Sequence, residues 1–332
     1  MSIRQHSPAP AVPAPGKITV PELTDMKRRG DPIVMVTAYD ATGGKLADAA
    51  GVELILVGDT AAMVVLGHES STVPVTMDEM LFLTRTVARS ARHPIVVGDM
   101  PFGSFQVSDE KALENAIRFV KEARADAIKL EGAGPMVSRV KTIVEAGIAV
   151  MGHVGLTPQS ATQLGGFKTQ GKTAEAAAAL VEGALALEEA GAFAVVLEAV
   201  PAPVAAEVTR RLTVPTIGIG AGRDTDGQVL VYHDLLGLSE GHLPRFVKRY
   251  ASLSREIRDA LEHYAEEVRD GTFPGDEHIY EMPEEELERF RSSISPSATR
   301  ANAQAKEPTM SSSKSLSPAP ASEPPVRKTS SP

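Results

Sequence analysis

Four apolar segments of the chain each end in a carboxylate, and this recurring pattern restricts the possible folds more than any other feature. Val, Ile and Leu dominate the segments, as is typical of strands buried on both faces of a parallel sheet. The carboxylates that end them are Asp59, Asp99, Glu131 and Glu198. Because the carboxyl ends of parallel strands meet at one edge of a sheet, the pattern predicts a site that binds a cation and moves protons.

Strand and helix patterns alternate through the central part of the chain. The capping box Thr76-Met-Asp-Glu79 predicts a helix to about residue 91, and Gly191 predicts the end of an Ala-rich helix over 174–190. The predicted strands are Ile33–Ala38, Leu54–Val57, Ile95–Val97, Ala127–Leu130, Ala149–Gly152, Phe193–Leu197, Thr216–Ile219 and Val229–Tyr232. Strands and helices in this number predict an α/β fold, a closed (β/α)₈ barrel, with a doubly wound open sheet as the alternative.

The two ends of the chain differ in composition from its centre. Residues 1–16 are rich in Pro and Ala, and residues 292–332 hold 12 Ser and 7 Pro and no aromatic residue. Such segments cannot bury enough apolar surface to fold, so we expect a disordered leader and a disordered tail. Residues 17–291 are then one catalytic domain.

The catalytic domain is predicted to end in one long helix over 244–270. A helical repeat places apolar residues on one face of it: Phe246, Tyr250, Leu253, Ile257, Leu261, Tyr264 and Val268. We expect this stripe to pack on the barrel or on a neighbouring subunit; a groove for another partner is the alternative.

Composition narrows the class of protein. The net charge is −9, which argues against nucleic acid as a partner. The absence of cysteine excludes disulfides, thiolate metal sites and thiol nucleophiles. No apolar run approaches the roughly 20 residues of a membrane span. We therefore expect a cytoplasmic protein that binds neither nucleic acid nor membrane.

The carboxylates suggest specific chemistry, but each allows a second interpretation. Asp59 and Asp99 are oxygen ligands suited to Mg²⁺, or they are helix N-caps. Lys129 and Glu131 lie two residues apart and face the same side of a strand, either as a structural ion pair or as an anion-binding lysine beside a metal-associated acid. His153 is an acid–base candidate or simply a hydrogen-bonding residue.

Two glycine-rich segments follow predicted strands. Gly218-Ile-Gly-Ala-Gly222 could bind phosphate through backbone N–H groups, or it could be a tight turn with close backbone approach. It does not have the spacing of a dinucleotide-binding motif. Gly165-Gly166-Phe167-Lys168 is interpreted as a mobile loop over the barrel mouth, or as ordinary turn chemistry.

Short motifs in a fixed order, from about Ile18 to Tyr280, resemble those of the ketopantoate hydroxymethyltransferase (3-methyl-2-oxobutanoate hydroxymethyltransferase) family. They are Val57-Gly-Asp-Thr60, Val65-Leu-Gly-His68, Pro74-Val-Thr76, Asp99-Met-Pro-Phe-Gly-Ser-Phe105, Ile128-Lys-Leu-Glu-Gly132, Gly152-His-Val-Gly-Leu-Thr-Pro-Gln-Ser160, Gly165-Gly-Phe-Lys-Thr-Gln-Gly171, Gly218–Gly222, Asp226-Gly-Gln-Val-Leu-Val231 and Phe273-Pro-Gly-Asp-Glu-His278.

The resemblance implies a (β/α)₈ barrel of the phosphoenolpyruvate- and pyruvate-type enolate superfamily. It implies transfer of a hydroxymethyl group from 5,10-methylenetetrahydrofolate to 3-methyl-2-oxobutanoate, giving 2-dehydropantoate and tetrahydrofolate. The reaction would pass through a Mg²⁺-stabilised enolate and belong to pantothenate and coenzyme A biosynthesis. The resemblance also implies a homo-oligomer, a decamer in typical members.

By motif match, the resemblance implies a role for each site residue. Asp59 and Asp99 would be the metal ligands, with Glu131 a third acid at the ion, directly or through water. Thr60 and Lys129 would hold the substrate carboxylate, Glu198 would accept the proton, and His153 would lie near the new hydroxyl group. The chain departs from the family pattern at two positions, where Thr60 replaces a serine and Thr169 a valine.

Two alternatives to this function stay open at the level of sequence. One is another Mg²⁺-dependent lyase of the same superfamily, although those lyases use a cysteine acid and this chain has none. The other is a barrel that only binds metabolites, against which the presence of Lys129, Glu131 and Glu198 together argues.

Overall fold

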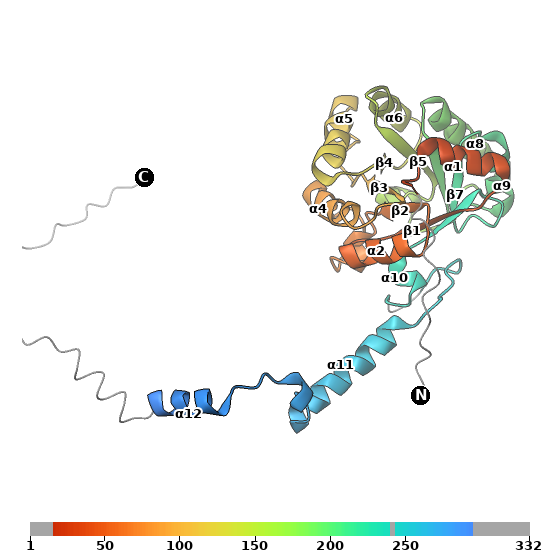
Figure 1. Cartoon of the computed structure of the whole chain (residues 1–332). Coiled ribbons are helices and arrows are strands. Elements are labelled where there is room, and N and C mark those ends of the chain that lie inside the picture. Colours follow the sequence, from red (N-terminus) through yellow and green to blue (C-terminus); the bar gives the residue numbers. More distant parts are fainter. Residues whose placement is uncertain (1–15, 240–242, 295–332) are drawn as a thin grey trace, which may run out of the picture. The chain divides into compact units, whose positions relative to one another are not determined.

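Eight parallel strands close into a barrel in the computed structural model of the chain, which describes residues 16–239 and 243–294. The order around the barrel follows the chain, with β8 paired to β1, so the closed barrel is confirmed and the open sheet is excluded (Figure 1). The strands are β1 (Ile33–Thr37), β2 (Leu54–Val57), β3 (Ile95–Asp99), β4 (Ala127–Lys129), β5 (Ala149–Gly155), β6 (Ala194–Glu198), β7 (Thr216–Ile219) and β8 (Gly227–Leu230).

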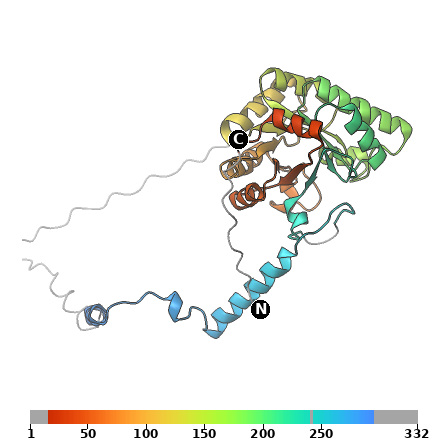
Figure 2. The ribbon, with the colours of Figure 1, turned by 45° about the vertical axis from the view of Figure 1, so that its right-hand side comes forward.

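Helices surround the strands, as the two views of the ribbon show (Figures 1 and 2). The capping box at Thr76 is confirmed, since its hydroxyl accepts from the backbone of Glu79 and the Glu79 carboxylate accepts from the backbone of Thr76. The helices up to β8 are α1 (Val20–Arg29), α2 (Ala41–Ala49), α3 (Ala61–Val64), α4 (Met77–Ala88), α5 (Asp109–Arg118), the π-helix η1 (Phe119–Ala123), α6 (Met136–Glu145), the 3₁₀ helix η2 (Pro158–Ser160), α7 (Ala161–Leu164), α8 (Ala174–Glu189) and α9 (Ala202–Arg211).

Apolar side chains fill the barrel interior toward the amino-terminal ends of the strands. Alternate residues of the strands point inward, so the filling residues recur with a period of two, as in Ile95 and Val97 of β3. Helix α1 adds the fully buried Leu23 to this cluster, and Lys27 of α1 forms an ion pair of 2.8 Å with Asp226, just before β8. Helix α1 therefore closes the amino-terminal end of the barrel, and the opposite end remains for function.

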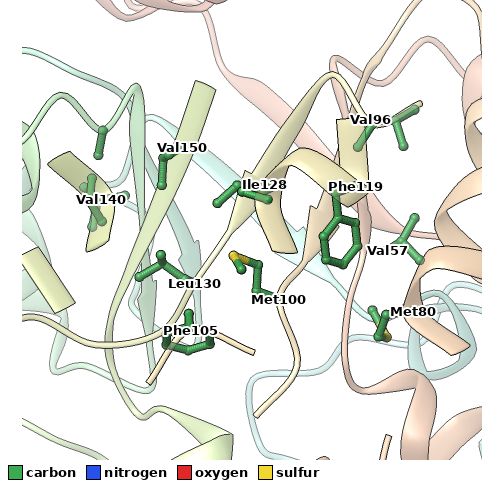
Figure 3. Packing of buried hydrophobic residues seen from close by; sticks show 14 of the residues in the cluster. Val57, Met80, Val96, Met100, Phe105, Phe119, Ile128, Leu130, Val140 and Val150 are labelled. Atoms are coloured by element: carbon green, nitrogen blue, oxygen red, sulfur yellow. The ribbon is translucent and has the colours of Figure 1, made fainter. Parts of the chain in front are cut away.

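A second apolar layer lies between the strands and the surrounding helices. Figure 3 shows part of it, with Phe119 beside residues of β2 and β3, and Met100 near Leu130. Gly98 of β3 is required there, because a Cβ at this position would lie 2.5 Å from Cδ1 of Phe119. The close approach of η1 to the strand holds β3, and so Asp99, in a tightly packed setting.

The predicted helix over 244–270 is wrong at its start. After α10 (Tyr232–Leu235), helix α11 spans only Leu253–Asp270, and residues 243–252 are not helical. The backbone N–H groups of Tyr250 and Leu253 donate to the carbonyl groups of Leu235 and Leu236. Because these donors bond to the end of α10, the segment does not continue as a helix, and Phe246 leaves the predicted stripe.

By their internal contacts the described residues divide into two compact units, one up to Leu261 and one from Glu262 onward. The described part of the second unit holds the end of α11, the 3₁₀ helix η3 (Asp276–His278) and α12 (Glu284–Ser293), with the Phe273 ring between those of Tyr264 and His278. Helix α12 overlaps the first residues of the predicted tail; the rest of that tail, and the leader up to residue 15, lie outside the described residues. No helix within the described ranges is long and apolar enough to cross a membrane.

Candidate active site

The polar residues of the site form the next layer after the apolar filling of the barrel, toward the carboxyl ends of the strands. In β3 the inward positions Ile95 and Val97 are followed by Asp99, and in β4 Ala127 is followed by Lys129. Strand pairing sets Asp99 beside Lys129. The same alternation brings His153 of β5 and Glu198 of β6 to the carboxyl end of the barrel. The ends of β3 to β6 therefore bring these residues to one edge of the barrel, as predicted for the carboxylates Asp99 and Glu198.

Lys129 is the central cation of this layer. Its Nζ lies 2.8 Å from Oδ1 of Asp99, 3.8 Å from Oε1 of Glu131 and 3.3 Å from Nδ1 of His153. Burial alone would lower the pKa of Lys129, but the carboxylates of Asp99, Glu131 and Asp59 raise it above its ordinary value. The lysine is therefore charged, and it compensates acids that have been removed from water.

Glu198 lies on the other side of the histidine. Its Oε2 is 3.2 Å from Nε2 of His153, and its side chain, 17% exposed, is more accessible than that of Lys129 or Asp99. Burial raises the pKa of Glu198 to about 8, although Lys129 opposes the shift. Burial lowers the pKa of His153 well below its ordinary value. A neutral imidazole beside a carboxyl group that titrates near neutral pH is suited to proton transfer.

Asp59 and Asp99 lie at the ends of neighbouring strands. The backbone N–H of Asp59 donates to Oδ2 of Asp99 over 3.0 Å, and both residues are almost fully buried. Neither caps a helix, because Thr60, Thr76 and Ser108 occupy the N-cap positions of α3, α4 and α5. The N-cap interpretation of these two aspartates is therefore excluded. Burial raises the pKa of Asp99 to about 7, against the effect of Lys129.

Glu131 is held by backbone and cation contacts. Its Oε2 accepts from the backbone N–H of Gln159 over 3.0 Å, and Oε1 faces both Lys129 and His153. Burial raises the pKa of Glu131 well above its ordinary value. The lysine and glutamate thus form the buried ion pair that the sequence suggested, in the wall of a larger site.

The sequence interpretation missed Gln159 as a site residue. Its side-chain Nε2 donates to Oδ2 of Asp59 over 3.0 Å and to the carbonyl of Met100 over 2.9 Å. One signal was available: Thr157-Pro158 predicts a helix start, where backbone N–H groups lack partners within the helix and attract carboxylates. Glu131 is the carboxylate that uses the N–H of Gln159.

The chemistry of the donor set fits Mg²⁺. Within residues 16–239 and 243–294, no three side chains of His, Cys, Asp and Glu are arranged to hold a metal ion together. Mg²⁺ needs only one or two protein carboxylates, because water and substrate oxygens complete its shell. Asp59 and Asp99 fit that requirement by residue type and by their position at the ends of neighbouring strands, with Oδ1 of Asp99 already paired with Nζ of Lys129 over 2.8 Å.

The remaining residues and segments that the sequence singled out are Thr60 and the two glycine-rich segments. Thr60 is half-buried at the start of α3, and its side chain does not cap that helix. In the turn after β7, a Cβ at Gly220 would lie 2.6 Å from Cδ1 of Phe246, and one at Gly222 would lie 2.5 Å from Cβ of Ala202. This supports the interpretation of that turn as a close backbone approach. Gly165 ends α7 in the left-handed conformation, with φ of 75°.

Solved structures with the same barrel define the fold class. The chain is similar to phosphoenolpyruvate phosphomutase from Streptomyces platensis subsp. rosaceus, with a TM-score of 0.51, 15% identity, and coverage of 86% of this chain and 99% of that one. It is also similar to 2,3-dimethylmalate lyase of the PEP mutase/isocitrate lyase superfamily, with a TM-score of 0.50, 17% identity, and coverage of 87% and 99%. At this level of identity the likeness shows the fold alone, so the fold and the site together define a closed (β/α)₈ barrel with a buried cluster of ionisable residues at the carboxyl ends of its strands.

The chain belongs to the ketopantoate hydroxymethyltransferase family, whose pattern matches residues 17–276. It is 53% identical over 278 residues to 3-methyl-2-oxobutanoate hydroxymethyltransferase of Thermobifida fusca (strain YX), covering 83% of this chain and 99% of that protein. It is 56% identical over 264 residues to the protein of the same name from Moorella thermoacetica, covering 80% and 98%. The chain is therefore a transferase, which excludes the lyase and the binding-only barrel.

Proposed function

We propose that this enzyme transfers a hydroxymethyl group from 5,10-methylenetetrahydrofolate to 3-methyl-2-oxobutanoate. The products are 2-dehydropantoate and tetrahydrofolate, and one water supplies the hydroxyl oxygen. The name of the relatives supports the acceptor substrate and the transferred group. The product is a precursor of pantothenate, so the reaction belongs to coenzyme A biosynthesis.

The placement of Glu198 supports this function most directly. Its carboxyl group has a pKa of about 8 because of burial, and it lies at the barrel mouth beside neutral His153. A carboxylate with a raised pKa is a stronger base than an ordinary glutamate, and removal of a proton from a carbon next to a carbonyl needs such a base. Glu198 would take the C3 proton of the oxo acid, and the resulting enolate carbon would attack the folate methylene.

The other residues of the site would bind and orient the substrate. Lys129 would attract its carboxylate, with a hydrogen bond from Thr60, while neutral His153 would face the new hydroxyl group. Asp59 and Asp99 would hold one Mg²⁺, and Glu131 would be a third acid at the ion, directly or through water. When bound, the ion stabilises negative charge on the 2-oxo oxygen.

Product formation under defined omissions tests the proposal. The purified enzyme should form 2-dehydropantoate only when 3-methyl-2-oxobutanoate, methylenetetrahydrofolate and Mg²⁺ are all present. Chelation by EDTA should abolish turnover, and added Mg²⁺ should restore it. Full activity without methylenetetrahydrofolate, or with excess EDTA, would contradict the donor or the metal respectively.

A further inference from the structure

Gln159 makes more contacts within the active site than the roles above explain. The side chain is buried, with 6% of its surface exposed, and both ends of its amide are bonded. Nε2 donates to Asp59 and to the carbonyl of Met100, and Oε1 accepts from Nε2 of Gln106 over 3.2 Å. The partners determine the amide orientation, because a flipped amide would set its oxygen against two acceptors.

The backbone of the same residue holds the second acid. Its N–H donates to Oε2 of Glu131 over 3.0 Å. Gln159, which follows β5, therefore binds two carboxylates. Its side chain binds Asp59 at the end of β2, and its main chain binds Glu131 after the end of β4. Both bonds are buried, where a bonded partner restricts the orientation of a carboxylate far more than at the surface.

We propose that Gln159 is a positioning residue of the metal site: its amide holds one oxygen of Asp59, so that the other oxygen is directed to the ion. The inference rests on the proposed function, because it takes Asp59 as a ligand of Mg²⁺. Hydrogen-bond partners of metal ligands fix the orientation of those ligands, and their loss typically lowers metal affinity about 10- to 100-fold.

Gln106 extends this arrangement to the loop after β3. Its Oε1 accepts from the backbone N–H of Gly103 over 2.7 Å, while its Nε2 donates to Gln159. Phe102, 48% exposed, lies next to Gly103 in that loop. The loop that borders the barrel mouth is thus linked to Asp59 through two amide side chains.

The test is Mg²⁺ affinity, measured by titration calorimetry on the metal-free full-length protein without substrate. Gln159→Met removes the amide but keeps the backbone N–H to Glu131, so it isolates the contact with Asp59. We expect the dissociation constant for Mg²⁺ to rise about 10- to 100-fold. A matched control is Gln228→Met, whose Nε2 also donates to two acceptors, Gly222 and Thr225, away from these carboxylates; its affinity should stay within twofold.

A dissociation constant within twofold of wild type in folded Gln159→Met would overturn the inference. If that variant does not fold, Gln159→Asn decides the matter, because its amide is too short to reach Asp59, and unchanged Mg²⁺ affinity would again overturn it. A merely structural role would lower the melting temperature without changing the affinity of the folded protein. Asp59→Asn tests the metal site separately. If Asp59→Asn binds Mg²⁺ like wild type, the proposed metal site itself is wrong. If Asp59→Asn binds Mg²⁺ weakly while Gln159→Met binds it normally, only the positioning role of Gln159 is refuted.

Discussion

At the level of single residues, Lys129 has two possible roles: it binds the substrate carboxylate, or it only compensates the buried acids. If it binds the substrate carboxylate, Lys129→Ala should raise the KM for 3-methyl-2-oxobutanoate at least 10-fold and leave the KM for the folate nearly unchanged. Steady-state kinetics with each substrate varied in turn measures this. Lys129→Arg, which keeps the charge, should recover part of the affinity.

The purely structural account of Lys129 makes a different prediction. Removal of the lysine leaves Asp99 and Glu131 buried without their cation, which costs about 3–5 kcal/mol of stability. Urea unfolding of Lys129→Ala in EDTA would show that loss in either account. An unchanged KM for the oxo acid together with the stability loss would support the structural ion pair alone.

The raised pKa of Glu198 makes the stability of the metal-free protein depend on pH. The group titrates near its ordinary 4.5 when unfolded and near 8 when folded, in a setting that includes His153, Lys129 and Asp59. Between these values the unfolded state releases the proton and the folded state keeps it, so this group lowers stability as pH rises from 4.5 to 8.

Glu198→Gln lacks that titration and reveals the effect. Relative to wild type, the free energy of unfolding of the variant in EDTA should increase by more than about 1 kcal/mol between pH 5 and pH 8. Taking the difference between the two proteins removes most of the contribution of other groups. If variant and wild type differ by the same free energy of unfolding at both pH values, the carboxyl group of Glu198 is not held protonated in the folded state.

At the scale of single elements, local signals predicted most boundaries and non-local bonds explain the failures. The Thr76 capping box and the apolar runs of β2, β3 and β6 are contained in neighbouring residues, so the sequence reveals them. The start of α11 depends on backbone bonds to the end of α10, the preceding helix, and such bonds leave no signal in the residues next to the helix start. Gln159 was missed for the same reason: its partners Asp59 and Glu131 come from other strands.

The capping box offers a test of one element. Thr76→Ala removes the hydroxyl that accepts from Glu79 at the start of α4, which should lower the free energy of unfolding by about 1 kcal/mol. Thr86→Ala in the interior of α4 is the matched control and should change it by less than about 0.5 kcal/mol. Urea denaturation measures the free energy of unfolding of both variants. Equal changes would mean that the Thr76 hydroxyl contributes no more to stability than a threonine in the interior of the helix.

At the scale of the whole molecule, the apolar side chains of α11 remain exposed. Ile257, Leu261, Tyr264 and Val268 are about half exposed or more, with 48%, 61%, 54% and 47% of their surfaces accessible. Exposed apolar faces of this kind usually mark association sites. The prediction of a homo-oligomer larger than a dimer, a decamer by family resemblance, therefore still stands as a prediction.

Light scattering of the full-length protein at micromolar concentration tests the assembly. We expect a mass several times the 35.1 kDa of one chain. Leu261→Asp should lower that mass, since a charge cannot be buried in an apolar contact without a large cost. A monomeric wild-type protein would contradict the prediction and leave the chemistry of the site unaffected.

If Glu198 removes the C3 proton of the oxo acid, it also catalyses hydrogen exchange at that carbon. NMR can follow the replacement of the C3 proton of 3-methyl-2-oxobutanoate by deuterium in D₂O, with enzyme and Mg²⁺ but no folate. Wild type should catalyse the exchange, Glu198→Gln should slow it about 10²- to 10⁴-fold, and Glu182→Gln, at an exposed position of α8, should match wild type. Exchange by Glu198→Gln at a rate close to wild type would contradict the role of Glu198 as the base and assign that role to another residue.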